Sequence, residues 1–129
     1  MPNNLENPEY KKLKIGSIEL MVEIADDTKE LGQGLSGRQG LTEGTGMLFV
    51  YTQPTSHNFW MKGMKFALDF IWISNNTVIQ IDENVPPPTT PTAEPARIYP
   101  HNRYDMVLEV PAGWVKSSNI KEGDKAELL

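Results

Sequence analysis

The sequence contains no cysteine, which excludes disulfide bonds, thiolate metal sites and thiol nucleophiles together. It has no run of about 18 apolar residues, so we expect no membrane span. Positive charge is scarce: 12 Lys and Arg face 17 Asp and Glu, and the net charge of −5 argues against nucleic acid as a partner. There are two histidines, His57 and His101, without a close-spaced ligand pair, and no nucleotide-binding glycine motif, so we expect no metal and no cofactor.

The length of 129 residues is that of one domain. Residues 1–11 are polar and are expected to form a flexible N-terminal arm, and residues 12–129 a single β domain. The arm lacks the apolar stretch of a signal peptide. This leaves two compartments open, the cytoplasm and, for a protein whose leader has been removed, the cell exterior.

Short segments of alternating apolar and polar residues predict β-strands. Residues 12–24 alternate around Gly16-Ser17 and predict a hairpin, and residues 67–82 predict a second hairpin around a turn at 74–77. Asp27, with Glu30 three positions later, predicts the start of a short helix. The fold class we expect is mainly β: an antiparallel jelly-roll-like sandwich or partly open barrel with one or two short helices.

Proline is concentrated in one segment. Residues 83–104 hold six of the ten prolines, among them three in succession at 86–88. Consecutive prolines favour extended polyproline II over a paired strand. We therefore predict a proline-rich loop at 83–104, a length at which loops tend to be functional or mobile.

Several sequence motifs occur in a fixed order along nearly the whole chain. They are Val22–Asp26, Gln33–Arg38, Gly46–Val50, Phe59–Lys62, Leu68–Ile73, Val107–Gly113 and Gly123-Asp124. In this order they resemble the domain-of-unknown-function 192 family (DUF192) of bacteria and archaea, over roughly residues 13–129. The resemblance implies a small, mostly β domain akin to a jelly-roll sandwich and no established activity.

The chain departs from that family in two places. The motif Phe59–Lys62 commonly continues with Asn-Thr in the family, whereas this chain has Gly63-Met64. Members often carry cysteines in the proline-rich loop, where this chain has threonines at 89, 90 and 92.

Four side chains form the predicted ligand site: Arg38, Trp60, Lys62 and Asp69. Asp69 lies in an apolar strand and needs a partner if it is buried, for which Arg38 and Lys62 are the candidates. The functional interpretation is a shallow site beneath the proline-rich loop, in which the aromatic and cationic side chains bind a polar ligand. The structural interpretation is an ion pair at the helix exit, with residues 59–61 in the core.

Three functions follow from these features. The first is a non-catalytic binding module for a polar or carbohydrate-like ligand. The second is a structural, self-assembling subunit of a fibre or oligomer that uses the arm or the proline-rich loop to pair with another copy. The third is a small hydrolase that uses Asp69, Glu109 and His57, which requires these side chains to meet in an open cleft.

Overall fold

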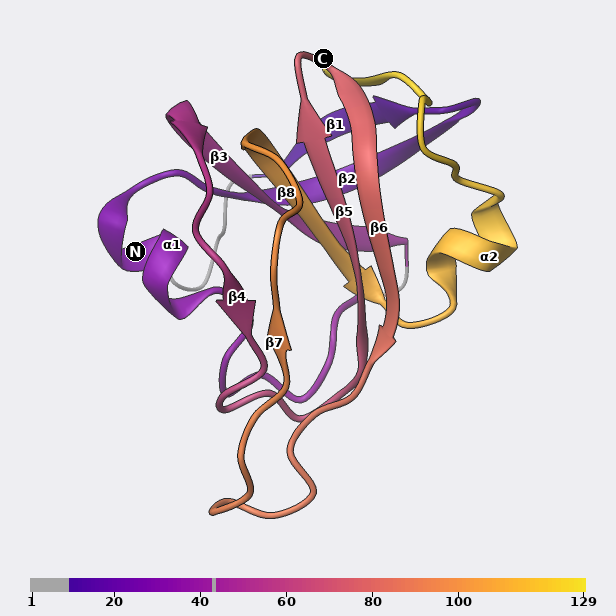
Figure 1. Ribbon diagram of the computed structural model, residues 1–129. Helices are drawn as coiled ribbons and strands as arrows, with labels where there is room; N and C mark the ends of the chain where they lie inside the picture. Colours follow the sequence, from indigo (N-terminus) through magenta and orange to yellow (C-terminus); the bar gives the residue numbers. More distant parts are fainter. Residues whose placement is uncertain (1–9, 43) are drawn as a thin grey trace, which may run out of the picture.

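The computed structural model describes residues 10–42 and 44–129. The elements along the chain are β1 (Tyr10–Ile15), β2 (Ile18–Ala25), α1 (Thr28–Gln33), β3 (Thr45–Thr55), β4 (Phe59–Trp60), β5 (Leu68–Ser74), β6 (Thr77–Val85), β7 (Arg97–Ile98), β8 (Tyr104–Pro111), α2 (Trp114–Ser118) and β9 (Ala126–Leu128). The fold is mainly β with two short helices, as the sequence predicts (Figure 1). Neither helix in the described ranges is long and apolar enough to cross a membrane.

Seven strands form one sheet in the order β6-β5-β8-β3-β2-β1-β9, and β4 pairs with β7 in a small second sheet. The two predicted hairpins are confirmed as β1–β2 and β5–β6. One pairing differs from the antiparallel expectation, because β2 and β3 run parallel. A parallel pair needs a crossover connection, and the segment that holds α1 supplies it.

The large sheet curls so that its two edge regions meet at one end, which gives a half-barrel. Thr77 at the start of β6 bridges Lys125, just before β9. The N–H of Val78 donates to the carbonyl of Asp124 at 2.8 Å, and the N–H of Ala126 donates to the carbonyl of Asn76 at 2.9 Å. The partly open barrel therefore describes the architecture better than two separate packed sheets.

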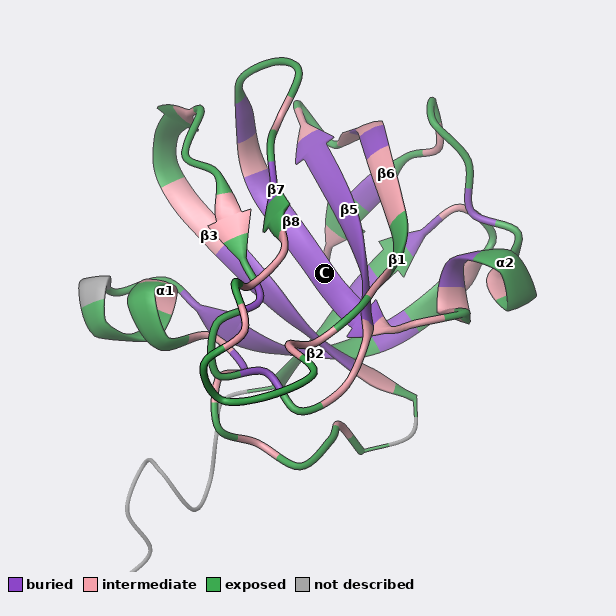
Figure 2. Ribbon diagram, turned by 60° about the horizontal axis from the view of Figure 1, so that its bottom comes forward, coloured by how far each residue is buried: buried purple, intermediate pink, exposed green. Residues whose placement is uncertain are grey.

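Both faces of the curled sheet carry a hydrophobic core, because neighbouring residues along a strand point to opposite faces. Ile71 and Leu108 belong to the core on the α2 side. Phe70, Trp72 and Val107 belong to the core on the other face, which α1, β4 and β7 cover. The central strands β5 and β8 are accordingly buried along most of their length, as Figure 2 shows.

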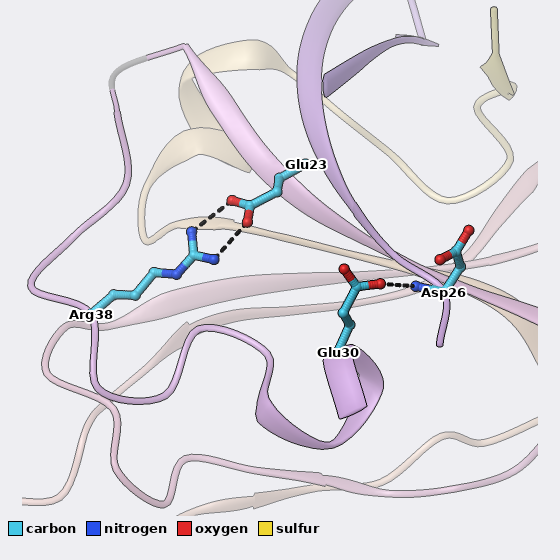
Figure 3. Close-up of polar contacts among 4 residues, drawn as sticks. All are labelled: Glu23, Asp26, Glu30 and Arg38. Carbon is cyan, nitrogen blue, oxygen red and sulfur yellow. Dashed lines mark hydrogen bonds and ion pairs between the residues drawn. The ribbon is translucent and has the colours of Figure 1, made fainter. Parts of the chain in front are cut away.

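The predicted helix start at Asp27 is confirmed. The Asp27 carboxylate accepts a hydrogen bond from the N–H of Glu30 at 2.8 Å. The Glu30 carboxylate reaches back to the N–H of Asp26 at 3.3 Å, one residue before the position typical of a capping box (Figure 3). The helix ends at Gln33, followed by Gly34 with a positive φ of 53°.

Parts of the predicted arm and of the predicted proline-rich loop form paired β-strands. Tyr10 and Lys11 of the expected arm begin β1, and the rest of the arm lies outside the described residues. In the proline-rich segment 83–104, β6 continues to Val85 and β7 pairs with β4. The side chain of Gln80 holds the residues directly after β7, since it donates to the carbonyl of Tyr99 and accepts from the N–H of His101.

Candidate functional site

A cavity of about 620 Å³ opens on the sheet face that carries α1. Its walls come from α1 and the turn after it, from β3, from the segment 57–64, from β5 and from one residue of β8. The residues that line it are Leu31–Ser36, Phe49, Tyr51, His57–Met64, Leu68, Phe70 and Glu109. The volume is within the range of roughly 300–1,000 Å³ that small-molecule sites occupy.

Aromatic rings form a continuous wall of this cavity. Phe59 packs edge-on against Phe49 with ring centroids 5.1 Å apart, and against Phe70 at 5.8 Å. On the same side Phe59 also meets Trp72 at 5.5 Å, and Trp72 is fully buried. Edge-to-face contacts of this kind hold ring positions closely, so the wall is preformed.

Glu109 is the buried acid of the cavity. Its position in β8 places it beside Met47 of β3 and Phe70 of β5, on the face opposite Leu108. Its exposed fraction is 4%, and within the described residues it has no hydrogen-bond or ion-pair partner. Burial raises the pKa of its carboxyl group to about 8. Burial also raises the pKa of the Tyr51 hydroxyl, and the charge of Glu109 adds to this rise.

Two turns close one side of the cavity by direct contact. The Ser36 hydroxyl donates to the carbonyl of Lys62 at 3.2 Å, and the N–H of Gly37 donates to the carbonyl of Gly63 at 2.9 Å. Gly63 has a φ of 75°, and a Cβ on it would overlap Ser36 Oγ. Both the positive φ and the closeness of Ser36 favour glycine at this position.

Arg38 forms an ion pair, with a different partner from the predicted one. Its Nη1 and Nη2 each lie 2.6 Å from an oxygen of Glu23 in a two-bonded arrangement (Figure 3). The side chain of Glu23 is 9% exposed and that of Arg38 is 40% exposed. Glu23 raises the pKa of Arg38 by accepting these hydrogen bonds. Arg38 is not among the residues that line the cavity.

Asp69 is fully buried and faces the α2 side of the sheet. Its Oδ1 accepts from the N–H of Asn84 at 2.8 Å, and its Oδ2 accepts from Gly113 at 3.1 Å and Val115 at 3.0 Å. The expectation that Arg38 or Lys62 is its partner is wrong, because three backbone N–H groups satisfy the carboxylate. Asp69 thus ties β5 to the end of β6 and to the start of α2.

Trp60 and Lys62 lie at the cavity, as residues of the same lining segment. Trp60 is 44% exposed. The Nζ of Lys62 lies 5.0 Å from the centroid of its ring, and the Cζ of Arg97 lies 4.7 Å from it. Of the three residues 59–61 that the core interpretation grouped together, Met61 alone is fully buried.

The three side chains of the hydrolase hypothesis are separated. Glu109 and His57 line the cavity, whereas Asp69 is on the opposite face of the sheet. None of the hydrogen bonds between described residues joins any two of these side chains. No group of three His, Asp or Glu suited to a metal ion occurs in the part of the chain that the structure describes. Among the described residues that line the cavity, none belongs to the proline-rich segment 83–104.

Sequence reasoning missed Glu23, and it considered Glu109 as a residue of the hydrolase hypothesis and not as a ligand-binding residue. The signal for Glu109 is visible in the sequence, since it is the one charged residue within the apolar run 106–110. The aromatic wall was not recognisable, because Phe49 and Phe59 come from separate segments.

Comparison with known proteins shows where this fold and its sequence recur. The family model DUF192, described as Uncharacterized ACR, COG1430, matches residues 11–128. A crystal structure described as a putative transcription regulator from Sinorhizobium meliloti 1021 is similar at a TM-score of 0.82 and 29% identity, over 94% of this chain and 95% of that one. A crystal structure of a protein of unknown function from Novosphingobium aromaticivorans DSM 12444 is similar at a TM-score of 0.81 and 24% identity, over 98% of this chain and 91% of that one. No curated protein matches.

Proposed function

This chain belongs to the DUF192 family, and from that premise we propose that it is a non-catalytic binding domain for a small molecule. The ligand enters the cavity between α1, β3 and the segment 57–64. Its polar group contacts Glu109, and its carbon skeleton lies against Phe49 and Phe59.

The observation that carries this proposal is the state of Glu109. A largely buried carboxyl group without a protein partner costs free energy, and carboxyl groups with perturbed pKa values cluster at functional sites. Here the group lies in a cavity large enough for a ligand and walled by aromatic side chains. A ligand that hydrogen-bonds to Glu109 replaces the water that the carboxyl group loses on folding.

The proposal keeps two of the residues that the sequence predicted. Trp60 and Lys62 stay as contacts at the cavity, where an exposed ring and an ammonium group suit a polar or carbohydrate-like ligand. Glu109 replaces Arg38 and Asp69, because Arg38 pairs with Glu23 and does not line the cavity, and backbone N–H groups satisfy the Asp69 carboxylate.

The test is a ligand screen followed by NMR on the labelled protein. Chemical-shift changes are expected to concentrate at the lining residues of β3, β4 and β8. Leu31→Trp, which enlarges a half-buried lining side chain, is expected to abolish binding. Ile18→Trp, a similar enlargement at a half-buried position on the other core, is the control and is expected to bind normally. The same ligand-induced shift changes in the Leu31→Trp variant as in the unchanged protein would contradict the proposal.

A further inference from the structure

Three acidic side chains lie in one row across the sheet. Glu23 of β2 is in register with Met47 of β3, which is in register with Glu109 of β8. The row continues through Phe70 of β5 to Asp82 of β6. All five side chains therefore project from the same face of the sheet, the face that carries the cavity.

Two of these three acids have partners that compensate them. Glu23 is paired with the guanidinium group of Arg38. The Oδ2 of Asp82 accepts hydrogen bonds from Trp72 Nε1 at 2.7 Å and from Gln80 Nε2 at 2.9 Å. Glu109, between them in the row, is as buried as Glu23 and has no such partner among the described residues.

We propose that the ligand of this cavity is an organic amine, whose ammonium group pairs with the Glu109 carboxylate and whose carbon skeleton lies on the aromatic wall. The inference rests on the proposed function and specifies the chemical class of its ligand. An ammonium group supplies what Arg38 supplies to Glu23, a positive charge with hydrogen-bond donors.

The surroundings of Glu109 suit a cation. The wall of Phe49, Phe59 and Phe70 offers ring faces and edges, and aromatic faces attract ammonium groups. The titratable side chains that also line the cavity are Tyr51, His57 and Lys62. The ammonium of Lys62 is held over the ring of Trp60, which leaves the acid to the ligand. The net charge of −5 further favours the approach of cations.

The first experiment compares matched probes in which an ammonium group replaces a hydroxyl group. Tryptamine is measured against tryptophol, and glucosamine against glucose, by titration calorimetry and NMR on the whole chain. We expect the amine of a pair to bind at least about tenfold more tightly than its hydroxyl analogue, the advantage of a charge-assisted hydrogen bond. Glu109→Gln preserves the shape of the side chain and is expected to remove this advantage.

A second readout is the proton balance of binding. Near neutral pH the free Glu109 carboxyl group is mostly protonated, whereas the ammonium ligand requires it ionised. Amine binding is therefore expected to release about one proton, measured by calorimetry in buffers of different ionisation enthalpy. A neutral ligand that hydrogen-bonds to the protonated acid releases none.

The outcomes distinguish a failure of the amine inference from a failure of the proposed function. Neutral probes that bind as tightly as amines at the cavity, or amine binding without proton release, overturn the amine inference and leave the binding domain intact. Amine binding that survives Glu109→Gln also overturns it. If no probe of a wider set of such amine and neutral pairs shifts the lining residues, the proposed function and the inference both fail.

Discussion

Glu23 and Glu109 project from the same face of the sheet on either side of Met47, and only Glu23 has a cationic partner. Both are buried to a similar degree. Of these two acids, Glu23 is compensated by the protein and Glu109 has no compensating group among the described residues. This difference within one row supports a ligand role for Glu109 more strongly than burial alone does.

The stability of the protein is expected to fall as pH rises through the range in which Glu109 would ionise. Its pKa is raised from 4.5 to about 8 in the folded state, so between these values the folded chain binds more protons than the unfolded one. More protons bound in the folded state mean that unfolding becomes easier as pH rises, by at most about 1.4 kcal/mol per pH unit from this group. Glu109→Gln is expected to flatten this slope in urea denaturation. Equal slopes in the two proteins would show that Glu109 is already compensated.

Removing the guanidinium group of Arg38 is expected to destabilise the fold without affecting the cavity. Arg38→Ala leaves the carboxylate of Glu23 buried and unpaired, at a cost of about 1–3 kcal/mol in the free energy of unfolding. Lys12→Ala is the control, because Lys12 pairs with Glu19 in an exposed bridge of 3.4 Å and should cost less than about 1 kcal/mol. Loss of ligand binding at unchanged stability would instead place Arg38 in the binding site.

Asp69 is expected to contribute to stability alone. Asp69→Asn keeps the shape but puts an NH₂ group toward backbone N–H donors, so at least one donor loses its acceptor. We expect a loss of about 1–3 kcal/mol, measured by chemical denaturation. A folded Asp69→Asn variant should bind the ligand with unchanged affinity, since Asp69 faces away from the cavity. A large loss of affinity would contradict this assignment.

The turn at Gly63 is expected to reject a side chain for two separable reasons. Gly63→Ala suffers both the positive φ and the overlap with Ser36, whereas Gly37→Ala, with a φ of 85° and open space around the position, suffers only the first. Gly63→Ala should therefore be the more destabilising of the two in thermal unfolding. Combination with Ser36→Gly is expected to recover part of the difference. Equal effects of the two single substitutions would contradict the close packing of these turns.

The local elements of this fold were predictable from the sequence. Alternation and turn residues identify the hairpins at 12–24 and 67–82, and Asp27 with Glu30 identifies the helix start. The parallel pairing of β2 with β3 was not predictable from the sequence, because it depends on contacts between residues far apart in the chain. The curl of the sheet depends on such contacts as well, between the start of β6 and the residues before β9.

The site was only partly predictable for a related reason. Alternation in β2 places Glu23 on the polar face of the strand, but a second core covers that face at this position. A partner for Arg38 was therefore sought at Asp69. Trp60 and Lys62 were identified because their segment is dense in aromatic and cationic residues, and they do lie at the cavity. The cavity itself arises from packing, which no single segment encodes.

The most direct test of this account is a pH titration of the Glu109 side-chain carboxyl carbon by ¹³C NMR, with and without a saturating amine. We predict a pKa of about 8 in the free protein and a clearly lower value in the amine complex. A pKa in the ordinary range of glutamate in the free protein, unchanged by the amine, would show that Glu109 has no need of a ligand and would contradict the account.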